Sequence, residues 1–214
     1  MNRLLLPAIA LSLFASGVAC NPAPSDELLA RTRGGGVEIF FNMPGTNPQN
    51  QWNPDAERVM VELVRNARSR IDIAVMGFSR RSLVDALIEA WDRGVEIRFA
   101  GDAGHLDNMG YGAFRDRHIP MVSGNLTHIM HDKFLVVDDR FVMVATSNFS
   151  TSDMRQNSNN FILIDSPPIA ADFTTEFEQL FSGRFGNMKE EIRNPRTYQV
   201  GDTEVEVWFS PNED

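Results

Sequence analysis

The residues with the clearest chemical potential lie in one segment, 131–150, which reads HDKFLVVDDRFVMVATSNFS. His131 and Lys133 are two residues apart, so in a β-strand their side chains would face the same side, whereas Asp138 has the opposite parity. A neutral imidazole can attack phosphorus, and a lysine ammonium binds phosphate as a point charge. Cleavage of a phosphodiester also needs donors for the non-bridging oxygens and a proton for the leaving alkoxide. The segment therefore predicts chemistry on a phosphodiester.

Hydroxyl and amide groups follow in the same segment and just beyond it. Six residues separate Asp138 from the run Ala145-Thr146-Ser147-Asn148, and Asn157-Ser158-Asn159-Asn160 precedes an apolar run. The Asn148 amide, together with the Thr146 or Ser147 hydroxyl, can donate hydrogen bonds to a phosphate. These groups are the expected donors for the non-bridging oxygens.

The pattern H-x-K-x-x-x-x-D, formed by His131, Lys133 and Asp138, resembles the HKD motif of the phospholipase D superfamily. The family's usual continuation is Gly-Ser-x-Asn, which is similar to the run that ends at Asn148, and the expected order of elements from 37 to 183 is similar too. The resemblance implies a phosphodiesterase that forms a covalent phosphohistidine at His131. Lys133 and Asn148 would bind the phosphate, and Asp138 would have a mainly structural role. No metal ion or other cofactor is implied, because histidine and lysine supply what Mg²⁺ supplies elsewhere.

Two positions depart from the family's pattern. Ala145 stands where glycine is usual, and the asparagine-rich stretch around Asn159 lacks the carboxylate that many members use to orient the histidine. An amide oxygen can still accept a hydrogen bond from the imidazole N–H, but it stabilises an imidazolium less than a carboxylate does. The alternative function is therefore a non-catalytic, phosphate-binding half-domain that supports a partner motif.

One HKD motif is half of an active site, since the family places two histidines on either side of one phosphate. The second motif is expected from a missing C-terminal half or from a homodimer. Val205–Phe209 repeats the pattern of Val37–Phe41, so residues 201–214 are interpreted as a possible first strand of a second, absent repeat. We expect Val37, Ile39 and Phe41 to form a buried face, and 205–209 to form a strand. If the two segments are true repeats, 205–209 has no helix or sheet of its own to cover it, and should lie loosely on the domain or pair with an edge while leaving apolar area exposed.

Alternating strands and amphipathic helices predict an α/β fold, a mixed β-sheet flanked by helices on both faces, over residues 37–200. The expected strands are 37–41, 71–78, 95–100, 119–122, 134–138, 141–146 and 161–164. The expected helices are 55–69, 81–93, 109–117 and one that begins at 166–168 and ends at Gly183. Asp102, His105 and Asp107 follow a strand and are interpreted as a solvated loop, with substrate contact as the alternative.

The net charge of −9 gives the chain no general attraction for nucleic acid or anionic lipid, so phosphodiester binding requires local positive charge. Lysine is almost absent: Lys133 and Lys189 stand against 18 arginines. Phospholipid and nucleic acid both remain open as substrates.

The N-terminus has the pattern of a secretory signal peptide over residues 1–19, followed by a lipobox-like ending at Cys20. Cys20 is the only cysteine and is the expected lipidation site, and residues 20–36 are expected to form a tether. An ordinary cleaved signal is the alternative. These features predict an exported lipoprotein that a lipid anchor holds to a membrane, on its periplasmic or extracellular face.

Overall fold

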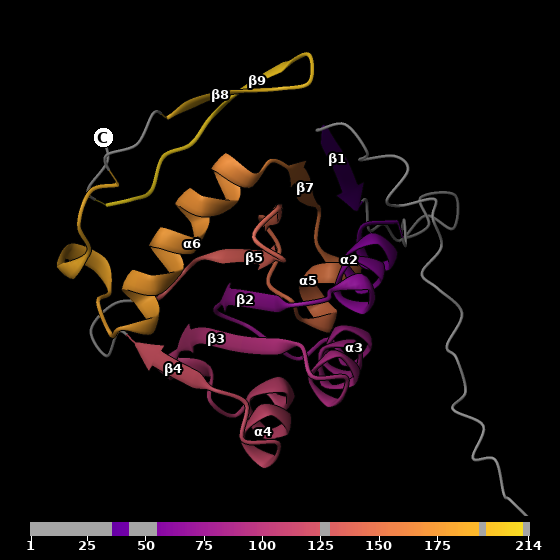
Figure 1. Ribbon diagram of the computed structural model, residues 1–214. Coiled ribbons are helices and arrows are strands. Elements are labelled where there is room, and N and C mark those ends of the chain that lie inside the picture. Colours follow the sequence, from indigo (N-terminus) through magenta and orange to yellow (C-terminus); the bar gives the residue numbers. More distant parts are fainter. Residues whose placement is uncertain (1–35, 43–54, 125–128, 193–195, 212–214) are drawn as a thin grey trace, which may run out of the picture.

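The computed structural model describes residues 36–42, 55–124, 129–192 and 196–211 (Figure 1). The expected signal peptide of residues 1–19, the lipidation site at Cys20 and all but the last residue of the 20–36 tether lie outside these ranges. None of the helices within these ranges combines the length and the apolar character that a membrane crossing needs.

Seven strands form one mixed sheet in the order β1-β7-β6-β5-β2-β3-β4. They are β1 (Val37–Asn42), β2 (Arg70–Val75), β3 (Glu96–Asp102), β4 (Met121–Gly124), β5 (Lys133–Val137), β6 (Phe141–Ala145) and β7 (Asn159–Asp165). β2, β3 and β4 are parallel, with helices in the connections between them, whereas β5, β6, β7 and β1 add antiparallel pairs. The predicted mixed α/β sheet is confirmed.

Helices cover both faces of this sheet (Figure 1). They are α2 (Asp55–Asn66), α3 (Arg81–Asp92), α4 (Met109–Asp116), α5 (Thr151–Gln156) and α6 (Pro167–Phe181). Short 3-10 turns lie at Ala103–His105 and Gly186–Met188. Along β5, Leu135 belongs to the core under α2, α3 and α4, whereas Phe134 belongs to the core under α6. This alternation gives the domain two apolar layers, one on each side of the sheet.

The edge strand β1 corrects one expectation. Ile39 and Phe41 are 55% and 54% exposed, while Phe40 packs against the core under α2. β1 lies outside β7, and α6 packs mainly over β2 to β6, so the helix does not cover the face that carries Ile39 and Phe41. The prediction that Val37, Ile39 and Phe41 form a buried face is therefore wrong.

The C-terminal segment also differs from its expected form. A separate hairpin of β8 (Thr197–Val200) and β9 (Thr203–Glu206) lies along the outer side of α6 (Figure 1). The strand thus ends before Val207, which is buried. The ring of Phe209 packs edge-on against the ring of Phe173 of α6, with 5.0 Å between the ring centroids. The expected lack of cover is therefore wrong for Val207 and Phe209, whereas Trp208 is 50% exposed, as an apolar residue left uncovered would be. The assignment of 201–214 to a second, absent repeat stays a prediction.

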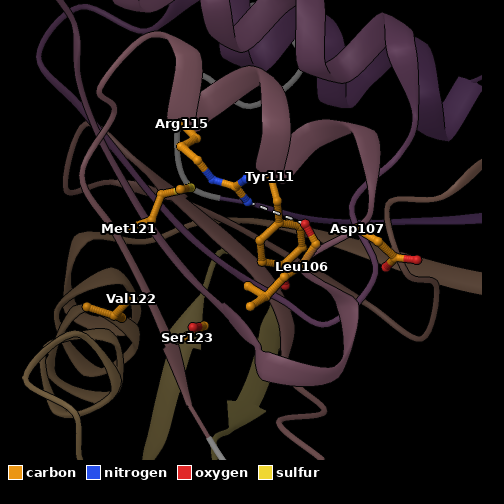
Figure 2. Close-up of a pocket in the computed structure, with 7 residues that line it drawn as sticks. All are labelled: Leu106, Asp107, Tyr111, Arg115, Met121, Val122 and Ser123. Atoms are coloured by element: carbon orange, nitrogen blue, oxygen red, sulfur yellow. Dashed lines mark hydrogen bonds between the residues drawn. The ribbon is translucent and has the colours of Figure 1, made fainter.

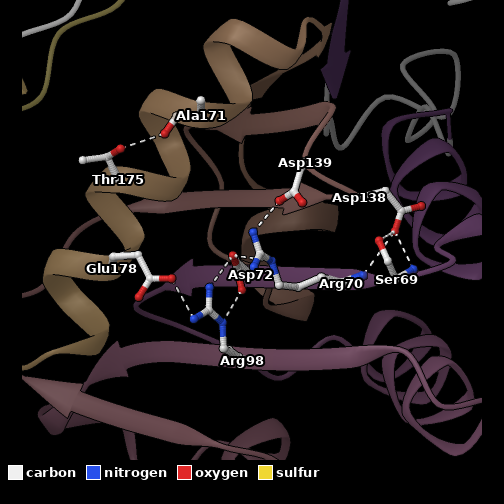
Figure 3. Close-up of polar contacts among 9 residues, drawn as sticks. All are labelled: Ser69, Arg70, Asp72, Arg98, Asp138, Asp139, Ala171, Thr175 and Glu178. Atoms are coloured by element: carbon white, nitrogen blue, oxygen red, sulfur yellow. Dashed lines mark hydrogen bonds and ion pairs between the residues drawn. The ribbon is translucent and has the colours of Figure 1, made fainter.

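A charged pair lies between the sheet and α6, on strands that the sequence indicates to be apolar (Figure 3). Arg98 of β3 binds both carboxylate oxygens of Asp72 at 2.7 and 2.8 Å, and it also contacts Glu178 of α6 at 2.8 Å. Its guanidinium lies over the rings of Phe177 and Phe181. Burial raises the pKa of Asp72, and the hydrogen bonds and positive charge of Arg98 oppose that shift.

Candidate functional site

Most of the predicted site residues lie at one end of the sheet, the edge formed by the strand ends at Lys133, Ala145 and Asn159, whereas Asp138 lies at the opposite end. Lys133 begins β5 opposite the last residue of β2, and Asn159 begins β7 opposite Asn42 at the end of β1. β6 ends at this edge as well, and the segment after it carries Asn148. Because antiparallel neighbours alternate starts with ends, residues far apart in the sequence reach the same edge.

Lys133 is buried at this edge, with 7% of its surface exposed. Its ammonium donates a hydrogen bond to the main-chain carbonyl of His131 at 2.8 Å. Burial lowers the pKa of Lys133, and the negative charges of Asp132 and Asp153 oppose that shift. When it is protonated, the lysine is a cation in a partly apolar environment, where its charge acts strongly on a bound anion.

His131 is exposed and precedes β5, which begins at Lys133. The expectation that the two side chains share a strand face therefore does not apply, since only Lys133 is in the strand. His131 borders a pocket of about 400 Å³ with walls from Leu180, Phe185 and Lys189 among others. An exposed imidazole beside a pocket is accessible to a substrate.

Asn148 is held in place from two sides. Its side-chain oxygen accepts the N–H of Gly77 at 3.2 Å, and its own N–H donates to the Asp153 carboxylate at 3.2 Å. The amide –NH₂ of Asn148 has no acceptor among the described residues, so it remains a donor for a ligand. Gly77 makes this possible, because a Cβ at that position would lie 3.2 Å from two side-chain carbons of Asn148.

The hydroxyls expected to assist Asn148 have other partners. The Thr146 hydroxyl donates to the side-chain oxygen of Asn159 at 2.9 Å and accepts the N–H of Asn160 at 2.9 Å. Ser147 is buried, and its hydroxyl donates to the carbonyl of Asn148 at 2.6 Å. Both hydroxyls thus support the loop after β6, and Asn148 is left as the donor in this run.

Asn159 is also engaged within the protein. Its oxygen accepts from Thr146, and its –NH₂ donates to the carbonyl of Asp153 at 2.9 Å. The described structure contains no hydrogen bond from Asn159 to the His131 ring. The suggested role of this amide in orienting the imidazole stays a prediction.

Asp138 lies at the opposite end of β5 from Lys133, about 16 Å away at 3.3 Å per residue. Its carboxylate accepts the main-chain N–H groups of Arg68, Ser69 and Arg70 and the hydroxyl of Ser69, at 2.8 to 3.2 Å. Figure 3 shows Asp138 beside Ser69 and Arg70. These bonds attach the turn after β5 to the start of β2. The position agrees with the structural role that the resemblance implies.

Asp102 corrects the expectation of a solvated loop after β3. Its side chain is almost wholly buried and accepts hydrogen bonds from the N–H of Met130, the N–H of Gly104 and the Nδ1 of His105, each at 2.8 Å. The Tyr111 hydroxyl accepts the N–H of Asp102 at 2.8 Å. Asp102 therefore attaches the residue next to His131 to the end of β3, a role that no local pattern indicated.

A second pocket of about 570 Å³ is lined by the segment after β3, by α4 and by β4 (Figure 2). Leu106, Asp107 and Tyr111 line one part of it, and Met121 to Ser123 of β4 line another. Arg115 reaches the carbonyl of Leu106 at 3.5 Å (Figure 2). His131 and Lys133 do not line this pocket.

Known proteins match both the sequence and the fold. A family model described as cardiolipin synthase, PLD-like domain, matches residues 60–181, more than half of the chain. A mitochondrial cardiolipin hydrolase of Xenopus laevis is 29% identical over 126 residues, which cover 58% of this chain and 60% of that protein. A phospholipase D of Rickettsia prowazekii is 25% identical over 118 residues, covering 54% and 58%. The chain thus spans somewhat more than half the length of these curated relatives.

Solved structures agree in fold. The phospholipase D family member Nuc from Salmonella typhimurium has a TM-score of 0.59 at 20% identity, covering 69% of this chain and 95% of that one. NucT from Helicobacter pylori also has a TM-score of 0.59, at 17% identity, with coverage of 70% and 97%. At these identities the likeness shows a common fold.

Proposed function

The chain belongs to the phospholipase D superfamily, and from that premise we propose that it cleaves phosphodiesters through a covalent phosphohistidine on His131, without a metal ion. The observation that carries the proposal is the arrangement at the sheet edge. The exposed His131 lies beside the buried cation of Lys133, and Asn148 keeps an amide donor free of partners within the described residues.

In the proposed reaction, the neutral imidazole of His131 attacks phosphorus, so that an N–P bond forms as the P–O bond to the leaving group breaks. Lys133 and the –NH₂ of Asn148 stabilise the charge on the non-bridging oxygens. The departing alkoxide takes a proton from a second histidine. The second histidine, now neutral, then takes a proton from water, whose oxygen forms a P–O bond as the N–P bond of the phosphohistidine breaks. This step releases the phosphate monoester and restores the neutral imidazole of His131.

The second histidine must come from a second unit, either another copy of this chain or a further motif downstream of residue 214. A homodimer with two copies of His131 facing one phosphate would supply it. Light scattering of the protein, together with activity of a mixture of wild-type and His131→Ala chains, distinguishes a dimeric site from a missing half.

The substrate is proposed to be a phospholipid head-group ester, with nucleic acid as the alternative. The names of the relatives, cardiolipin hydrolase and phospholipase D, support the lipid. Export and lipid anchoring at Cys20 would place the site at a membrane, which also supports the lipid. Mass spectrometry of the mature protein should find an acylated Cys20 as its first residue.

The activity test uses the purified protein with EDTA on cardiolipin, phosphatidylcholine, a bis-aryl phosphodiester and DNA. We expect turnover of at least one of these, loss of that turnover in His131→Ala with an unchanged circular dichroism spectrum, and a covalent adduct on the peptide that contains His131. The adduct is trapped with an alkaline quench, because a phosphohistidine hydrolyses in acid. If neither the protein nor its mixture with a downstream unit turns over any of them, the non-catalytic phosphate-binding function replaces this proposal.

A further inference from the structure

Asp153 lies in the first turn of α5 and joins several segments at the edge of the sheet. Its carboxylate accepts the main-chain N–H of Asn148 at 3.2 Å and the side-chain amide of Asn157 at 2.6 Å. Its carbonyl accepts the side-chain amides of Asn42 at 3.2 Å and Asn159 at 2.9 Å. We propose that Asp153 is a positioning residue of the phosphodiester site, which fixes the segment carrying Asn148 and maintains a negative charge close to Lys133.

The inference rests on the proposed function, in which Asn148 and Lys133 bind the phosphate. Asn148 follows β6, and its main chain is held by Asp153 while its side-chain oxygen is held by Gly77. These two bonds orient the remaining –NH₂ donor. Both Asp153 oxygens accept hydrogen bonds from the protein, so the carboxylate holds neighbouring segments of the chain and does not bind the substrate itself.

The charge of Asp153 acts on Lys133. Burial lowers the pKa of this lysine, and the carboxylates of Asp132 and Asp153 favour the protonated form. Two further neighbours of the lysine among the described residues are uncharged: His131 offers its carbonyl oxygen, and the facing residue on β2 is the apolar Val75. Without Asp153, Asp132 would be the one of these two carboxylates that still favours the protonated form of Lys133.

Asp153 also has an ordinary structural contact. Its N–H donates to the hydroxyl of Ser150, the N-cap of α5, at 3.1 Å, and an acidic residue in the first turn favours a helix. A residue that only stabilised α5 would, when mutated, reduce activity to the same extent at every pH. A residue that maintains the charge of Lys133 would reduce activity mainly at high pH.

The chain offers a direct measurement, because Lys133 and Lys189 are its only lysines. Lysine labelled with ¹³C at Cε gives two NMR signals, and Lys189→Arg identifies the one from Lys133. In Asp153→Asn we expect the titration midpoint of Lys133 to fall by about one pH unit, the effect of removing a nearby opposite charge. Asp153→Glu should restore most of the shift. Asp116→Asn, at an exposed carboxylate on α4, serves as the matched control and should leave the midpoint unchanged.

Activity supplies the second measurement. In Asp153→Asn the alkaline limb of the plot of kcat/KM against pH should move to lower pH by about one unit. At pH values above that limb, kcat/KM should then be about tenfold lower than in the wild type. Below the midpoint of the variant, where Lys133 is protonated in both proteins, only the smaller, pH-independent loss from a less firmly held Asn148 should remain.

An unchanged Lys133 midpoint in Asp153→Asn would overturn the proposal, as would an equal loss of activity at all pH values. The NMR titration does not depend on turnover. A second outcome is that the Lys133 midpoint falls as expected in Asp153→Asn while the wild-type protein cleaves no substrate. That result would refute the proposed function and leave the coupling of Asp153 to Lys133 established.

Discussion

Replacing Asp102 by asparagine tests how the segment that carries His131 is attached to the sheet. The buried Asp102 carboxylate accepts one hydrogen bond from the N–H of Met130, immediately before His131, and two on its other oxygen, from Gly104 and His105. Asparagine has nearly the same shape but one acceptor oxygen, and its –NH₂ would face an N–H donor on one side. The substitution therefore breaks at least one of these bonds without creating a cavity.

The expected cost follows from these contacts. A hydrogen bond to a charged group contributes about 1.5 to 3 kcal/mol, and the remaining bonds weaken with loss of the charge, so we expect a loss of about 3 kcal/mol. For a domain of this size that corresponds to a decrease in Tm of roughly 6 to 12 °C. Burial opposes the shift, but the bonds from His105, Met130 and Gly104 hold the pKa of Asp102 below its ordinary value. This stabilisation is present above the unfolded pKa and is lost as pH falls through the folded pKa, so the difference should shrink below about pH 4.

Three measurements check this prediction: thermal unfolding, hydrogen exchange at the Met130 amide, and kcat/KM. Asp102→Asn should lower Tm, speed hydrogen exchange at the Met130 amide and lower kcat/KM. Activity falls because a loosened Met130 displaces His131. Asp107→Asn, at an exposed carboxylate on the same loop, should change stability by less than about 0.5 kcal/mol. A Tm within the range of that control, with unchanged exchange at Met130, would refute the role of Asp102.

The remaining predictions concern the phosphate site and its surroundings. Gly77→Ala should displace Asn148 by a few tenths of an ångström and lower kcat/KM by about threefold to tenfold, whereas Gly112→Ala, where an added Cβ meets nothing within 4 Å, should leave it unchanged in the same assay. Lys133→Ala should cost roughly 3 kcal/mol or more of transition-state stabilisation, and an unchanged kcat/KM would contradict its role. Because the net charge is −9, kcat/KM on DNA should rise as salt increases from low to physiological concentration, and a steep fall would indicate a basic binding surface instead.

The sequence predicts the framework well because its signals are local. Periodic apolar residues and helix ends place the sheet strands and four helices within a few residues of their observed bounds. Two elements were missed for different reasons. α5 has six residues and contributes one buried side chain, Met154, so it has too little periodicity to detect. β8 alternates polar and apolar residues over four positions, which is too short a pattern to distinguish from a loop.

The contacts that complete the site could not be predicted, because each joins residues far apart in the sequence. Asn42 and Asp153 are 111 residues apart, and Asp102 and Met130 are 28 apart. A carboxylate at the end of an apolar strand has the same local pattern whether it is solvated or buried under hydrogen-bond donors. The sheet order decides between these cases, because it brings the end of β3 beside the segment that precedes β5.

The charges around Lys133 give a physical reason why the proposed mechanism would need a second unit. Asp132 and Asp153 are the two acidic groups that act on this lysine, and Lys189, which acts on Asp132, is paired with Glu176. These two lysines and three carboxylates sum to −1 when all are ionised. Burial raises the pKa of Asp132 and reduces that repulsion without converting it to attraction. A phosphodiester monoanion would then meet a slightly unfavourable field in a single unit, apart from the donor of Asn148 and a neutral His131. A protonated histidine from a second unit offsets this field as well as supplying the proton for the leaving group, so substrate affinity and catalysis should depend on the same assembly step.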